Sequence, residues 1–334
     1  MSFEDRRNRQ QYPYEPSVTF TLAPGLKVLR GRVILAGTVV ISAGTTNGTV
    51  IGEGGPINLV RRVQLYANRA GNSRYPGGRI VDCSARALMR YAIVERQGKF
   101  MGDLLGSTLG SGAAASYTIY TSIPIYFADS ALQNQMQTAL NMDLQDTQGN
   151  GVYASVQVQL SLASDLTTCF SGNDRTVNFS GLTVQWQDDR LQIGSDTTPL
   201  IQEDHETLIG AAQTRMIDPG MPVDGAFTSW FIMGEQSTTS KTLSQALLNR
   251  ITAFSSTLNF DEFANDIQQD MIDDEWFDPA QSLTGQYFLD WTHGLLQNSN
   301  PAAGMDLKFD VNNPSGSNLD QLRIYTRRVF ALAS

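Results

Sequence analysis

The chain has 334 residues, enough for about two domains of ordinary size, each with a substantial core. Its formal net charge is -9 and only 17% of its residues are charged, which argues against general nucleic-acid binding and is typical of surfaces that neighbouring subunits cover. Two cysteines and two histidines argue against a disulfide framework, a zinc site and histidine-based catalysis.

The first residues form a polar, glutamine-rich run that ends at two prolines, Pro13 and Pro16. This composition resists regular structure, so we predict an extended N-terminal arm over residues 1–16 that orders only against a neighbour. The run lacks the apolar centre of a secretory signal, and no stretch of the chain approaches ~18 consecutive apolar residues. We therefore expect a protein made in a reducing cytoplasm.

Alternating apolar and polar residues dominate the first half of the chain after the arm. The alternation predicts half-buried strands over residues 28–42, 117–127, 152–163 and 176–188. In the last of these the phase slips at Gly181, which predicts a β-bulge. Loops rich in Gly, Ser, Thr and Asn join the strands, as in antiparallel sandwiches.

Two segments have apolar residues at helical spacing, residues 82–97 and 261–277. Each follows a strand and precedes further strands, those of the second half being 285–291, 305–311 and 319–331. A repeated order of elements indicates two similar domains. We predict an all-β chain with two short helical insertions, built as two tandem jelly-roll β-sandwiches over 17–190 and 205–334, with a linker over 191–204.

Three segments suggest a family: LRGRVILAGT at 29–38, NLVRRVQL at 58–65, and GRIVD at 78–82 before the first helix. In these segments and in its architecture, the chain resembles the double jelly-roll major capsid proteins of tailless icosahedral DNA viruses, including bacteriophages. The resemblance implies a structural protein without cofactor or catalytic site, a homotrimer of pseudo-hexagonal outline, and an icosahedral shell.

The resemblance also implies where the protein is found and what it contacts. The location would be the virion, with the host cytoplasm as the place of assembly. The expected partners are further copies of the chain, minor capsid or vertex proteins, and inner-membrane lipids or the genome, which the N-terminal arm would reach inside the particle.

Arginines are the candidate assembly contacts, because basic groups within strands need carboxylate partners inside the subunit or across an interface. They lie in the arm and in two pairs on predicted strands: Arg6, Arg7, Arg9, Arg61, Arg62, Arg327 and Arg328. The carboxylates of residues 261–277 have three interpretations: a solvated helix face, a divalent-cation site, or a surface that docks on a neighbour's basic patch.

Two other functions are alternatives to a capsid subunit. A viral spike or fibre, or a carbohydrate-binding adhesion module, would use exposed aromatic residues and polar loops. A cupin-like enzyme would need a histidine-rich metal site, but His205 and His293 lie far apart in the sequence. We expect both histidines to be solvated or hydrogen-bonded side chains, and both cysteines to be buried thiols.

Overall fold

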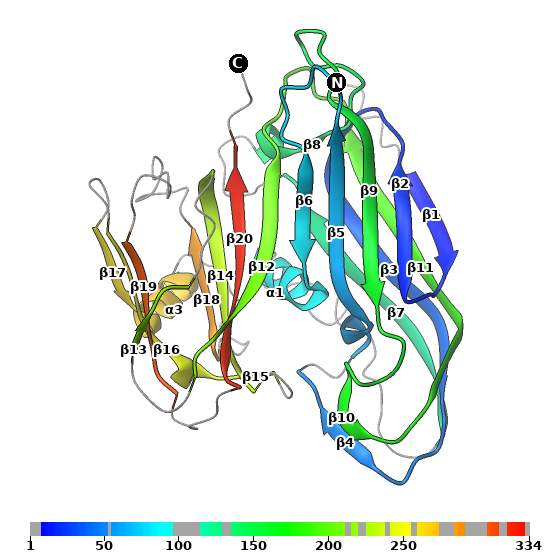
Figure 1. The fold of residues 1–334 in the computed structure, drawn as a ribbon, viewed down its shortest axis with the longest axis vertical. Helices are drawn as coiled ribbons and strands as arrows, with labels where there is room; N and C mark the ends of the chain where they lie inside the picture. Colours follow the sequence, from blue (N-terminus) through cyan, green and yellow to red (C-terminus); the bar gives the residue numbers. More distant parts are fainter. Residues whose placement is uncertain are drawn as a thin grey trace. The chain divides into compact units, whose positions relative to one another are not determined.

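The computed structural model describes residues 8–52, 55–95, 114–128, 135–210, 215–219, 225–237, 241–254, 259–273, 284–290, 306–313 and 319–330. The chain forms two compact units, the first chiefly Met1–Ala92 and Phe100–Ile201, the second chiefly Gln202–Val329. Strands dominate both units, as Figure 1 shows, so the predicted all-β class is confirmed.

The first unit contains a sheet that we call the β3 sheet. Its antiparallel strands lie in the order β1 (Asn8–Pro13), β11 (Val177–Leu191), β3 (Lys27–Ile41) and β7 (Ala115–Tyr126), and the short β8 (Leu140–Asn141) also pairs with β3. The register between β11 and β3 shifts between Asn178 and Gly181. This irregularity confirms the bulge predicted from the break in alternation.

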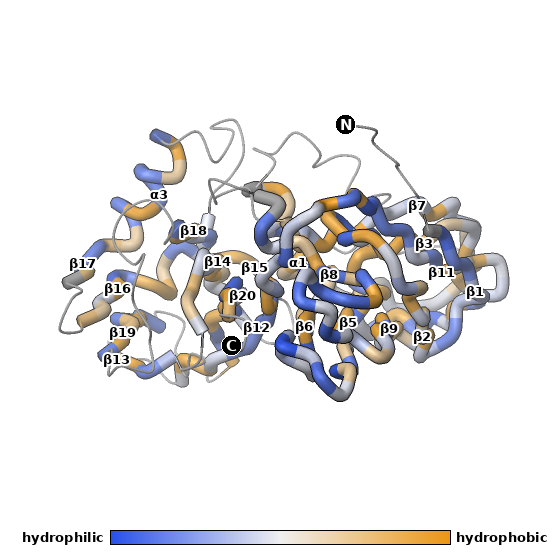
Figure 2. Tube along the Cα trace, turned by 90° about the horizontal axis from the view of Figure 1, so that it is seen from above, coloured by the Kyte–Doolittle hydropathy of each residue, from blue (hydrophilic) through white to orange (hydrophobic). Residues whose placement is uncertain are grey.

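A second layer of the first unit is the β5 sheet. Its strands lie in the order β6 (Gly78–Cys83), β5 (Val60–Arg69), β9 (Tyr153–Leu162) and β2 (Ser17–Leu22), and a separate ribbon pairs β4 (Asn47–Val50) with β10 (Phe170–Asn173). In β9, Val156, Val158 and Leu160 are buried while the residues between them are partly exposed. Figure 2 shows hydrophobic and hydrophilic positions alternating along the chain, as expected for sheets that cover a core on one face.

Short helices connect the strands of the first unit: η1 (Pro56–Leu59), α1 (Ala85–Glu95) and η2 (Gln135–Thr138). Helix α1 begins three residues later than predicted, because Asp82 and Cys83 still pair with β5. The Ser84 hydroxyl then accepts a hydrogen bond from the Ala87 N–H at 3.2 Å. A serine at this position satisfies an N–H group that has no partner within the helix.

The second unit also contains two sheets. The β14 sheet has the order β15 (Thr242–Leu243), β14 (Ala226–Gln236), β20 (Gln321–Val329) and β12 (Leu200–Leu208), with β18 (Gln286–Asp290) pairing with β14 beside β15. The β16 sheet has the order β13 (Arg215–Ile217), β19 (Asp306–Val311), β16 (Leu248–Phe254) and β17 (Asn259–Phe263). Helix η3 (Gln245–Leu247) precedes β16, and helix α3 (Ala264–Asp273) follows β17.

One hydrophobic cluster joins the two sheets of the second unit. It includes Trp230 from β14, Ile324 from β20, Ile251 from β16, Phe309 from β19 and Ile267 from α3. Because each sheet and the helix contribute buried side chains to the same cluster, the unit is a β-sandwich closed by α3.

Three boundaries differ from the prediction. The arm is not irregular over Asn8–Pro13, which pairs with β11 as an edge strand and packs Tyr12 against Phe20 at 5.2 Å between ring centroids. Pro13 stands at the end of this edge strand, where a missing N–H is tolerated. The predicted linker is irregular only over 192–199, because β12 begins at Leu200. The second helix begins at Ala264, and residues 274–277 lie outside the described part.

None of the helices in the described segments is long and apolar enough to cross a membrane.

Candidate functional site

The histidine and cysteine side chains that the structure describes are hydrogen-bonded or buried within the fold. The Nε2 atom of His205 lies 2.9 Å from the carbonyl oxygen of Pro219, and His293 lies outside the described residues. Cys83 and Cys169 are buried free thiols, as predicted, and burial raises the pKa of Cys169 to about 12. Across the described ranges, no group of three His, Cys, Asp or Glu residues is placed to hold a metal ion.

The three candidate arginines of the arm are only partly described. Arg6 and Arg7 lie outside the described residues. Arg9 lies on β1, and its Nε and Nη2 atoms donate to the Gln185 Oε1 atom on β11 at 3.1 and 2.6 Å. In this subunit, Arg9 therefore helps to hold the edge strand in the β3 sheet.

The two candidate arginines on β5 differ in their surroundings. Arg62 is half-buried and forms an ion pair with Asp82 on β6, which Gln64 also contacts at 3.0 Å. Burial acts to raise the pKa of the Asp82 carboxyl, but the bonds from Arg62 and Gln64 outweigh it, so the pKa lies below its ordinary value. Arg61 is exposed and has no hydrogen bond or ion pair in the part of the chain that the structure describes.

The pair on β20 is buried instead. Arg327 is 0% exposed and Arg328 is 5% exposed, and Arg328 forms an ion pair with Glu203 on β12. Both side chains are enclosed within the folded subunit, because β20 is a central strand with both faces covered. Arg327 and Arg328 are therefore poor candidates for assembly contacts, unlike the exposed Arg61.

A buried ionic cluster on the β14 sheet was not predicted. Arg323 on β20 is 3% exposed, and its guanidinium lies 2.7 Å from Asp204, 3.4 Å from Glu235 and in contact with Glu206. Burial acts to lower the pKa of Arg323, but Glu235, Asp204 and Glu206 outweigh it and raise the pKa above its ordinary value. The acceptors come from β12 and β14, so the cluster fastens three strands of one sheet.

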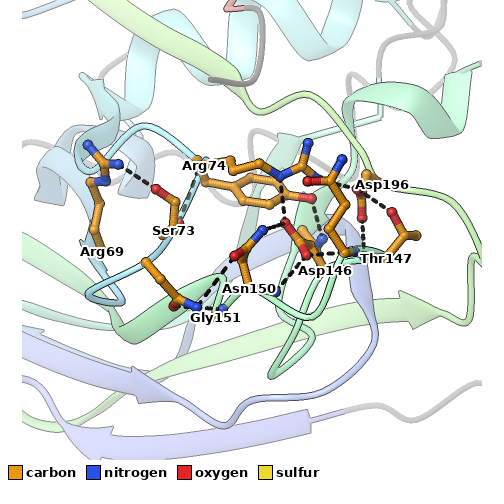
Figure 3. Close-up of polar contacts among 12 residues, drawn as sticks. Arg69, Ser73, Arg74, Asp146, Thr147, Asn150, Gly151 and Asp196 are labelled. Carbon is orange, nitrogen blue, oxygen red and sulfur yellow. Dashed lines mark hydrogen bonds and ion pairs between the residues drawn. The ribbon is translucent and has the colours of Figure 1, made fainter. Parts of the chain in front are cut away.

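A polar network joins three loops at one end of the first unit. Figure 3 shows Arg74, from the β5–β6 loop, between two carboxylates: it donates to Asp146 at 2.8 Å and to Asp196 at 2.6 Å. Asp196 also accepts from the Thr147 N–H at 2.9 Å and from its hydroxyl at 2.6 Å. These residues lie up to 122 positions apart, and the sequence analysis did not predict that they meet.

The electrostatics of this loop network favour ionised carboxylates. Burial acts to raise the pKa values of both Asp146 and Asp196, but hydrogen bonds outweigh it. For Asp146 the bonds come from Arg74 and from backbone N–H groups, and the pKa lies below its ordinary value. The network therefore fastens the three loops to one another within the first unit.

The β16 sheet, in contrast, has an exposed outer face, which we call the β16 face. The register places Met216, Asp310, Arg250 and Phe263 side by side across β13, β19, β16 and β17. Met216 is 50% and Phe263 57% exposed, and Phe254 on the same face is 42% exposed. Exposed large apolar side chains gathered on one face are typical of an interaction surface.

A pocket of about 680 Å³ lies at the Phe263 end of the β16 face. Its lining comes from η3, β16, β19, the end of β17 and the start of α3. It combines one aromatic ring, two carboxylates and three amides: Phe263, Asp266, Asp310, Gln245, Asn249 and Asn265. The acidic segment predicted as one helix thus divides, with Asp261 on β17 and Asp266 in the pocket wall.

Comparisons with known proteins bear on the fold. No family model matches the chain, and no curated protein matches it. Solved structures do match: the major capsid protein of Sulfolobus turreted icosahedral virus is 11% identical, with a TM-score of 0.66 over 99% of this chain and 97% of that chain. The Faustovirus major capsid protein is 7% identical, with a TM-score of 0.60 over 100% of this chain and 91% of that chain.

A bacteriophage protein is among the matches. The major capsid protein of bacteriophage PM2 is 9% identical, with a TM-score of 0.56 over 98% of each chain. At identities this low the likeness establishes the fold, and it confirms the resemblance predicted from the sequence at that level. The chain therefore has the double jelly-roll fold of viral major capsid proteins.

Proposed function

We propose that this chain is a major capsid subunit that forms trimeric capsomers of pseudo-hexagonal outline, which tile an icosahedral shell in the virion. The observation that carries the proposal is the match of both sandwiches, over nearly the whole chain, to capsid proteins of three different viruses. A single shared sandwich would be weak support, because sandwiches serve many functions. Two sandwiches in tandem, matching over 91 to 98% of the other chains, are a far more specific likeness.

The surface of the subunit supports self-association. The β16 face exposes Met216, Phe254 and Phe263, and the β3 sheet exposes Tyr120 at 61% on its edge strand β7 and Val40 at 50% on β3. A chain with only 17% charged residues has few groups that would oppose covering such faces. The partner in this proposal is therefore further copies of the same chain.

The segment before β1 is proposed to contact the interior of the particle. Because Asn8–Pro13 is a strand of the β3 sheet, a deletion test must stop before it. Removal of residues 1–7, with Arg6 and Arg7, is expected to leave the subunit folded but to weaken particle stability. Particles of unchanged yield and thermal stability would contradict this role.

Mass and shape in solution test the main proposal. The purified chain is expected to elute from size-exclusion chromatography with light scattering at three times 36.6 kDa, and electron microscopy should show capsomers or closed shells. A monomer that persists at high protein concentration and never assembles would contradict the proposal.

A further inference from the structure

The pocket end of the β16 face has more negative than positive charge. Arg250 is engaged by Asp261, which accepts from both its Nε and its Nη2 atoms. Asp266 and Asp310 line the pocket, and the pKa of the neighbouring Glu262 is raised, first by burial and then by nearby carboxylates. A site of this kind disfavours an anion and favours a cation.

The other lining groups select the kind of cation. Phe263 is 57% exposed, and its ring already has the Arg250 guanidinium 5.2 Å from its centroid. Flat amides at Asn249 and Asn265 add oxygen acceptors beside the carboxylates. A planar guanidinium can stack on an aromatic ring while its N–H groups donate to carboxylate and amide oxygens, which a compact metal ion cannot do.

The first unit has an arginine that is suited to this pocket. Arg61 on β5 is exposed and, within the described residues, makes no hydrogen bond or ion pair, whereas its neighbour Arg62 is held by Asp82. The Arg61 guanidinium acts electrostatically on Asp165 and Tyr14 of its own unit but is exposed and forms no direct ion pair in the described part of that unit. Its positive charge is complementary to the acidic, aromatic pocket on the second unit.

We propose that the β16 face of one subunit is the docking surface for a second copy of the chain, with Arg61 of that copy entering the pocket beside Phe263. The inference rests on the proposed function and specifies the contact between subunits. The two surfaces differ, one on each unit, so the contact is head-to-tail. A head-to-tail contact can close into a ring, and three copies would use three identical contacts.

A charge exchange tests the pairing. Arg61→Glu and Asp266→Lys are each expected to raise the trimer's dissociation constant at least about tenfold, because each places like charges together. Combining them restores an opposite pair, and we expect the dissociation constant to return to within about threefold of that of the natural chain. The measurement is the trimer fraction across a dilution series, by light scattering.

A matched control lies on the same helix. Asp273 is exposed, does not line the pocket and is not among the carboxylates that raise the pKa of Glu262. Asp273→Lys therefore makes the same change of charge and should leave the trimer unchanged. Circular dichroism and the unfolding midpoint of each variant verify that both units stay folded.

The outcomes separate this inference from the proposed function. Failure of the natural chain to form trimers would overturn both. If Arg61→Glu leaves the trimer's dissociation constant unchanged, the pairing alone is overturned. This holds even if Asp266→Lys weakens the trimer, because another segment would then occupy the pocket. Weakening by both single changes without recovery in the combined variant would also overturn it.

Discussion

At Gly31 on β3, the addition of a single methyl group should strongly destabilise the fold. A Cβ atom at Gly31 would lie 2.2 Å from Cη2 and 2.6 Å from Cζ2 of Trp186 on β11. The indole ring is 0% exposed, and its Nε1 atom donates to the buried Asp188 carboxylate at 3.0 Å. The ring is thus enclosed and fastened, so it cannot retreat freely from Gly31→Ala.

The size of the effect follows from this geometry. The ring would have to retreat by about 1.2 Å, from 2.2 to 3.4 Å, to reach ordinary contact. Overpacking of this kind costs about 1–3 kcal/mol, and a broken bond to a carboxylate adds about 1.5–3 kcal/mol. Removing a glycine from a strand offsets about 0.5–1 kcal/mol of this cost. We expect a net loss of about 2 kcal/mol or more, which lowers the unfolding midpoint by about 4 °C or more.

Thermal and urea unfolding, followed by tryptophan fluorescence and circular dichroism, would measure the loss. Gly194→Ala is the matched control, because nothing lies within 4 Å of a Cβ atom at Gly194, and it should change stability by less than about 0.5 kcal/mol. In a Trp186→Phe background, Gly31→Ala should cost less, because the smaller ring leaves room. If Gly31→Ala unfolds at the same midpoint as Gly194→Ala, the reasoning is refuted.

Two further predictions concern buried and exposed carboxylates. Asp188 is 0% exposed and pairs with Arg190 at 2.7 Å, so Asp188→Ala leaves a buried guanidinium without its carboxylate partner and should cost about 3–5 kcal/mol in urea unfolding. In an Arg190→Met background the cost should fall, and equal costs in both backgrounds would contradict the pairing. Asp174 has its pKa lowered from 3.8 to about 2, first by the Thr45 hydroxyl and then by backbone N–H groups of the same loop. Because the folded pKa is depressed, its stabilising contribution is full above about pH 4 and is lost as the pH falls toward 2. Carboxyl NMR titration checks this, and a midpoint near 3.8 would show that the hydrogen bonds are absent in solution.

Much of the fold was readable because it depends on local alternation. Strands that cover a core on one face, such as β3 and β9, were located to within one residue at each end. The break at Gly181 predicted the bulge for the same reason, since the side-chain period along a strand is two. Strand β14 was missed because nine of its eleven residues are buried, and a strand covered on both faces shows no alternation.

The candidate sites depended on pairing between distant segments. The sequence by itself determined the all-β class and the two-domain order, and it singled out Arg61 and Arg62 as a pair on a strand. Only the tertiary structure decided that Arg327 is buried, because burial of a strand arginine depends on whether the strand lies at the edge or the centre of its sheet. It also decided the β16 face, since Met216 and Phe263 meet on one surface only through the register of four strands. Register depends on long-range hydrogen bonds and core packing, which no local pattern of residues records.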